Sequence, residues 1–158
     1  MPQLVKGGKY VFAWTVVGKT GEITIPDEAV EEYRFSSGPV FILTGSKRSG
    51  GFALVSPESL KKSPLGAIVK SLPQLESRTV PEGEPVYHKG IPYCWVQLHD
   101  TDITLPETTL TIYGIRPGDT LLVVRGSGLG PAVIVKGPII EEAQTHPEIP
   151  WTRHADHR

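Results

Sequence analysis

Apolar residues occur along this chain in short runs separated by glycine and proline, a spacing typical of short strands joined by turns. The runs at residues 40–43 and 120–124 are apolar at almost every position, which predicts strands buried on both faces. The remaining predicted strands span residues 11–17, 22–25, 52–55, 93–98, 102–105 and 132–135.

Two short helices are predicted to begin at Pro26 and Pro106, because proline suits the first position of a helix, where no partner for a backbone N–H is needed. Asp27 and Glu107 follow these prolines, where negative charge favours a helix N-terminus. Residues 61–85 contain four prolines, so we expect no long helix there, only a turn or two within residues 65–72.

The sequence contains an internal repeat. Sliding the chain against itself by 80 residues aligns residues 6–60 with residues 86–140 without a gap, and nine of the 55 pairs are identical. The chain is therefore expected to contain repeat 1 (6–60), a proline-containing linker (61–85), repeat 2 (86–140) and a partly disordered tail (141–158). Because one unit of this size buries little surface, we expect the two copies to share a core.

The second copy contains the motif Ile103-Thr-Leu-Pro-Glu107 and then Tyr113-Gly-Ile-Arg-Pro-Gly-Asp119 before its apolar strand. The first copy repeats this pattern at residues 21–27 and 38–43. The pattern resembles that of the AbrB/SpoVT family of swapped-hairpin transition-state regulators. The resemblance implies a mainly β fold with short helices, a swapped-hairpin β-barrel formed as an intrachain pseudo-dimer, and a DNA-binding regulator of transcription.

DNA-binding members of that family have basic residues after the turn glycine and on the short helix. This chain has Glu22, Asp102, Glu31 and Glu32 at these positions, and carboxylates repel phosphates. The alternative function is therefore a protein-interaction or small-ligand module without DNA binding. The candidate residues for binding double-stranded DNA are Lys19, Arg34, Lys47, Arg48, Arg116 and Arg125, with Lys6, Lys9, Lys61 and Lys62 as further basic side chains near the first hairpin.

Composition adds little to the choice between a DNA-binding protein and a module that does not bind DNA. The chain has 158 residues, 39% hydrophobic and 21% charged, which suits a folded domain, and its net charge of −1 lacks a strongly basic signature. The first 80 residues have a net charge of +3 and the rest −4, so a polyanion should prefer the first half. Lys47 and Arg48 in the glycine-flanked loop are the leading phosphate contacts, the alternative being a hairpin tip that only confers solubility.

No catalytic group is predicted, so we expect a protein that is not an enzyme. The single cysteine, Cys94, rules out an intrachain disulfide and lies in an apolar strand, where a thiol is unreactive, despite the presence of His88 and His99 in the sequence. The glycine motif at 126–130 precedes a predicted strand, whereas a dinucleotide site requires a helix there.

No metal or cofactor is expected either. The histidines at 146, 154 and 157 lie in the tail, without a packed scaffold to hold a metal ion. No run of 18 apolar residues and no leader-like segment occurs, so we expect a cytoplasmic protein without membrane contact. The sequence leaves open whether the chain forms a homo-oligomer.

Overall fold

The computed structural model describes residues 10–126 and 129–152, and in this part the chain is mainly β-strand with short helices. The strands are β1 (Val11–Val16), β2 (Glu22–Thr24), β3 (Gly38–Thr44), β4 (Phe52–Val55), β5 (Val86–His88), β6 (Ile91–Leu98), β7 (Asp102–Thr104), β8 (Thr120–Val124) and β9 (Ala132–Ile134). The helices are α1 (Asp27–Glu32), α2 (Pro57–Lys61), α3 (Leu65–Lys70), α4 (Pro73–Glu76), α5 (Glu107–Ile112) and α6 (Pro138–Ala143).

All eight predicted strands are present. Two of them, β4 and β8, match the predicted ranges at both ends, β3 is longer by one or two residues at each end, and the others differ by one or two residues at one end. Helices α1 and α5 begin directly after Pro26 and Pro106, and α3 lies within the predicted range 65–72. The strand β5 and the helices α2, α4 and α6 were not predicted.

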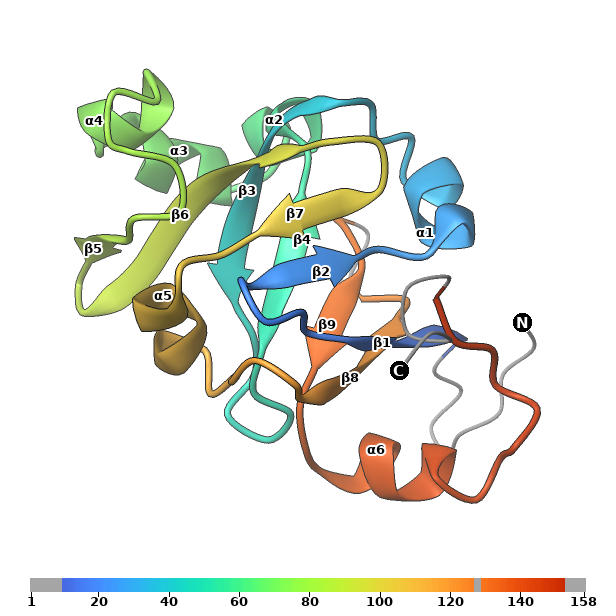
Figure 1. The fold of residues 1–158 in the computed structure, drawn as a ribbon. Helices are drawn as coiled ribbons and strands as arrows, with labels where there is room; N and C mark the ends of the chain where they lie inside the picture. Colours follow the sequence, from blue (N-terminus) through green and yellow to red (C-terminus); the bar gives the residue numbers. More distant parts are fainter. Residues whose placement is uncertain (1–9, 127–128, 153–158) are drawn as a thin grey trace.

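The strands of the two copies are interleaved in one antiparallel sheet, in the order β1-β8-β9-β4-β3-β6-β5 (Figure 1). The first predicted strand of each copy pairs with the third predicted strand of the other, so that β1 lies beside β8 and β6 beside β3. Two further pairs, β4 with β9 and β2 with β7, also join one copy to the other. Each copy therefore needs the other to complete its sheet.

The central core lies between this sheet and the small β2–β7 sheet, which crosses in front of it in Figure 1. Ile23 of β2 faces Ile103 of β7, and both are completely buried. The helices α1 and α5 contribute Ala29 and Leu110 to the same cluster. The shared core that the repeat predicts is therefore present, with matching contributions from both copies.

Residues that are 80 positions apart occupy equivalent places in the small sheet and in the helices α1 and α5. In the strands β3 and β8, residues 80 positions apart point to opposite faces of the sheet. In the first copy Val40 and Ile42 face the central core, whereas in the second copy Leu121 and Val123 do. These pairs are 81 residues apart, so Ile42 and its aligned partner Leu122 point to opposite faces. The shift is tolerated because both faces of these strands are apolar and buried, so the change of face exposes no apolar side chain.

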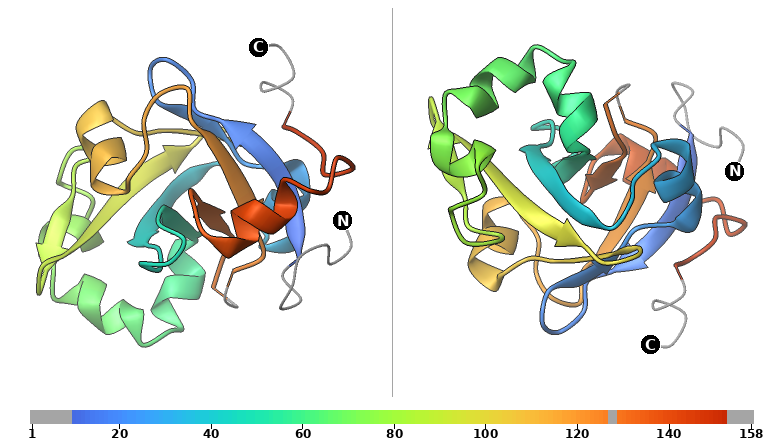
Figure 2. Two further views of the ribbon diagram at one scale, coloured as in Figure 1. Left: turned by 90° about the horizontal axis from the view of Figure 1, so that it is seen from below. Right: turned by 90° about the horizontal axis from the view of Figure 1, so that it is seen from above.

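The face of the large sheet that points away from the central core is covered by two segments, each of which begins in the last residues of a repeat and continues beyond it (Figure 2). The helices α2, α3 and α4, here called the linker helices, place Leu60, Val69 and Leu75 against β3, β4 and β6. Residues 138–152, here called the tail segment, place Ile140 and Ile149 against β1, β8 and β9. These two covers explain why the central strands are apolar on both faces.

Residues 141–152 of the expected tail are packed against the sheet. The last of these residues run along the free edge of β1, where the Trp14 N–H donates to the Pro150 carbonyl and the Thr152 N–H to the Trp14 carbonyl, both at 2.9 Å. Ile149 and Thr152 are buried, and the Trp151 ring stacks on Trp14 with centroids 5.8 Å apart. This apolar packing orders residues 141–152 despite two prolines, while residues 153–158 lie outside the described residues.

Candidate nucleic-acid interface

The loop between β3 and β4 is a tight hairpin tip that exposes Lys47 and Arg48. The Gly50 N–H donates to the Ser46 carbonyl at 2.8 Å, and the Ser49 N–H donates to the Ser46 hydroxyl at 3.1 Å. Gly50 adopts a φ of 66°, a left-handed conformation that glycine reaches without strain. Within the described residues neither cation has a carboxylate within 4.0 Å, so both charges are available to a partner.

Lys136, which is not among the six predicted candidates, joins this tip from the other copy. Its N–H donates to the Ser49 carbonyl at 3.1 Å, and the N–H of Val135 donates to the same oxygen at 2.9 Å. The Lys136 side chain is exposed, and we call Lys47, Arg48 and Lys136 the basic tip. Only the pairing of β4 with β9 brings these residues together, so no local signal could have identified Lys136.

Lys19 and Arg116 lie on another part of the surface, where the end of β1 meets the segment that precedes β8. The Gly118 N–H donates to the Val17 carbonyl at 2.8 Å, which brings the two segments together. Lys19 lines a cavity of about 490 Å³ together with the acidic residues Glu22 and Asp102. These two carboxylates oppose a phosphate there, so Lys19 is a weaker phosphate contact than the basic tip.

Arg125 is engaged within the protein. Its guanidinium donates two hydrogen bonds to the Glu32 carboxylate, at 2.7 and 2.6 Å, and lies 4.3 Å from the centroid of the Tyr10 ring. The hydrogen bond to Glu32 is the main reason that the pKa of Arg125 is raised. Tyr10 in turn donates a hydrogen bond to Glu28. Arg125 therefore compensates one carboxylate of α1 and is a poor candidate for binding DNA.

The surface around α1 is consequently acidic. Asp27, Glu28, Glu31 and Glu32 are all exposed on a helix of six residues, with Arg125 as the paired cation. The basic tip lies at the lower edge of Figure 1, near α6, and α1 lies well away from it. Arg34 is also remote from the tip, because β3 separates them by seven residues, roughly 20 Å. The structure thus divides the six candidate residues among separate places: Lys47 and Arg48 lie at the basic tip, Lys19 and Arg116 where β1 meets the segment before β8, Arg34 just after α1, and Arg125 beside Glu32 of α1.

Cys94 lies within the strand β6, and the glycine motif at 126–130 lies just before the strand β9. Cys94 is completely buried, and burial raises the pKa of its thiol to about 12, which leaves it protonated at neutral pH. Its sulfur lies 4.0 Å from the Tyr113 hydroxyl. The glycine motif at 126–130 leads into the strand β9, as expected for a hairpin, although residues 127 and 128 lie outside the described residues.

His146 contacts two carboxylates, Glu142 at 3.1 Å and Glu148 at 3.2 Å, while His154 and His157 lie outside the described residues. Over residues 10–126 and 129–152, no group of three or more potential ligands is arranged to hold a metal ion. No helix in this part of the chain is long and apolar enough to cross a membrane.

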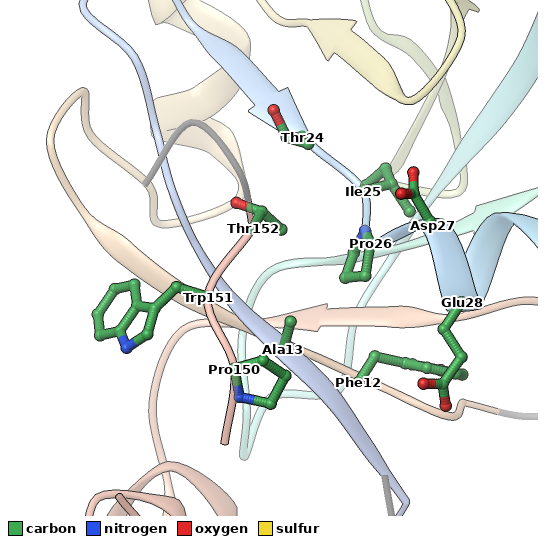
Figure 3. A pocket seen from close by; sticks show the side chains of 10 residues that line it. All are labelled: Phe12, Ala13, Thr24, Ile25, Pro26, Asp27, Glu28, Pro150, Trp151 and Thr152. Carbon is green, nitrogen blue, oxygen red and sulfur yellow. The ribbon is translucent and has the colours of Figure 1, made fainter. Parts of the chain in front are cut away.

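A cavity of about 200 Å³ lies between β1, the start of α1 and the tail segment (Figure 3). Phe12 and Pro26 supply apolar walls, and Asp27 and Glu28 supply the charge. In Figure 3 the Trp151 ring points away from the other lining residues. The two carboxylates make this cavity unsuitable for a phosphate.

Comparisons with protein-family models, curated proteins and solved structures found no match for this chain.

Proposed function

We propose that this protein binds double-stranded DNA as a transcriptional regulator of the AbrB-like type, with one chain supplying both halves of a swapped-hairpin barrel. The exchange of first strands between the copies supports this architecture, because β1 pairs with β8 and β6 with β3 in matching fashion. The two short helices that follow Pro26 and Pro106 occupy equivalent positions in the two copies, as the family pattern implies.

The basic tip is the observation on which the DNA interface rests. The loop between β3 and β4 supplies two exposed cations of the tip, and the residues after β9 supply the third. Within the described part of the chain none of the three forms an ion pair. A lysine or arginine at a loop tip can reach the phosphate backbone without entering a groove, so the contact is with phosphates and is weakly selective for sequence. Asp27 and Glu31, exposed on α1, disfavour contact of DNA with the surface around that helix.

The test is a titration of a fluorescent DNA duplex, followed by anisotropy at several salt concentrations. Three phosphate contacts should give a log–log slope of affinity against salt of about −3, and the Lys47→Ala/Arg48→Ala variant should reduce it to about −1. The control variant, Lys70→Ala/Arg78→Ala, removes the same charge from the exposed surface of the linker region and should keep the full slope. Absence of binding at low salt would exclude the proposal.

The second candidate function is a protein-interaction module that does not bind DNA. The acidic helix α1 favours it, because four exposed carboxylates suit a basic partner better than a nucleic acid. In the same titration, this function gives no DNA affinity for the unaltered protein.

A further inference from the structure

A third cavity, about 490 Å³ in volume, lies between the segment that follows α1 and the helix α2. This volume falls within the range of small-molecule sites. Phe35 and Val40, both buried, provide apolar lining, and Pro39 and Pro57 add to it. Arg34 and Lys62 line the same cavity from two different elements. The cavity therefore combines an apolar wall with two cations.

The polar groups in this cavity are only partly used by the protein. The Ser56 hydroxyl accepts a hydrogen bond from the Ser59 N–H and thereby caps α2, and the Ser37 hydroxyl accepts one from the N–H of Asp100. The hydroxyls of Ser36 and Ser59 have no hydrogen-bond partner among the described residues. They are the donors that an anion between Arg34 and Lys62 would use in addition to the two charges.

The two cations of the cavity favour an anion, and two nearby carboxylates oppose it in part. Glu58 lines the cavity, and Asp100 lies at its edge through its contact with Ser37. Neither Arg34 nor Lys62 forms a salt bridge with these or any other described carboxylates. Both cations are exposed and free to turn toward a ligand.

The backbone at Arg34 adds an independent observation. Arg34 has a φ of 56°, a left-handed conformation that costs free energy for any residue except glycine. The aligned residue of the second copy is Gly114, with a φ of 78°. The first copy thus has an arginine at a position where the second copy uses the residue that the backbone prefers, and this arginine lines the cavity.

From these observations we propose that the cavity binds a small phosphate monoester with an apolar or aromatic group, the phosphate lying between Arg34 and Lys62 and the apolar group against Phe35 and Pro39. A phosphate suits the site because its three terminal oxygens can accept from both cations and from the two serine hydroxyls together. The site is separate from the basic tip, at the opposite end of β3, so the proposal does not depend on DNA binding.

The experiment is a titration of the full-length protein with phenyl phosphate, followed by amide chemical shifts at constant ionic strength. Saturable shifts are expected at Ser36, Ser37 and Ser59, with inorganic phosphate binding more weakly and phenol not at all. Lys62→Ala should weaken phenyl phosphate binding by about tenfold or more, since charge-assisted hydrogen bonds are lost.

Arg34→Gly is the sharpest variant, because glycine relieves the left-handed backbone and should leave the unfolding midpoint unchanged or higher while binding falls by about tenfold. Arg78→Gly is its matched control: Arg78 also has a left-handed φ, 58°, and is exposed, but it does not line the cavity. Unaltered binding in Arg34→Gly and Lys62→Ala, or shifts that never saturate, would overturn the proposal. Retained binding in Lys47→Ala/Arg48→Ala separates this site from the DNA interface.

Discussion

The linker helices and the tail segment both cover the sheet, but the linker helices are attached to it more firmly. Both lie on the face that points away from the central core, but the linker helices are joined to strands at both ends, to β4 and β5, and they bury Leu60 and Leu75 almost completely. The tail segment follows β9 and meets the edge of β1 through two backbone hydrogen bonds, with Trp151 still 38% exposed. The comparison indicates that the tail segment opens at a lower free energy than the linker helices.

The largest expected effect is in the linker helices. Leu75→Ala removes a completely buried side chain from the cluster over β3, β4 and β6 and should lower the free energy of unfolding by about 2–5 kcal/mol. The measurement is urea denaturation followed by circular dichroism. A loss below about 1 kcal/mol would mean that the linker helices are no more firmly attached than the tail segment.

A smaller effect is expected in the tail segment. Trp151→Ala removes the ring that stacks on Trp14 and should cost about 1 kcal/mol. Hydrogen exchange should also become faster at the Trp14 and Thr152 amides, which form the edge contact, while amides between β3 and β6 keep their protection. Trp151→Phe, which retains a ring for stacking, is the control. Equal acceleration throughout the sheet would show that the tail segment does not open by itself.

The smallest expected effect is a dependence of the stability of the tail segment on pH. Hydrogen bonds that the protonated His146 ring donates to the carboxylates of Glu148 and, to a smaller extent, Glu142 raise the pKa of His146 above its ordinary value of 6.5. Because the pKa is higher in the folded state, the stabilisation is complete below pH 6.5 and is lost as the pH rises through the raised value. Protection of the Thr152 amide, corrected for intrinsic exchange, should therefore be greater at pH 5.5 than at pH 8.5. His146→Gln should abolish this difference and leave the linker helices unaffected.

Much of the fold could be predicted because its signals are local. The apolar runs of β4 and β8 define both ends of these strands, and Pro26 and Pro106 mark the helix starts. The tail segment was missed because its few buried residues, such as Ile149, show no helical or strand period between the prolines. The facing of β3 and β8 could not be predicted either, because a strand that is apolar on both faces has no polar side to mark its orientation.

The candidate interface could be predicted only where it depends on neighbouring residues. Lys47 and Arg48 follow from a loop with glycines on both sides, which predicts an exposed tip. Arg125 could not be excluded as a candidate from the sequence. Its partner Glu32 is 93 residues away, and no local pattern shows that the two side chains meet. Lys136 was missed for the same reason, since strand pairing between the copies brings it to Ser49.

The exchange of first strands also sets the order in which the chain folds. Val16 of β1 pairs with Thr120 of β8, about 100 residues further along the chain. During synthesis β1 leaves the ribosome well before β8, the strand with which it pairs. The apolar residues of β1 therefore stay without their native partners until β8 has been synthesised. Contacts between residues so distant in sequence are also slow to form, which makes the N-terminal strand the part of the nascent protein most in need of protection from aggregation.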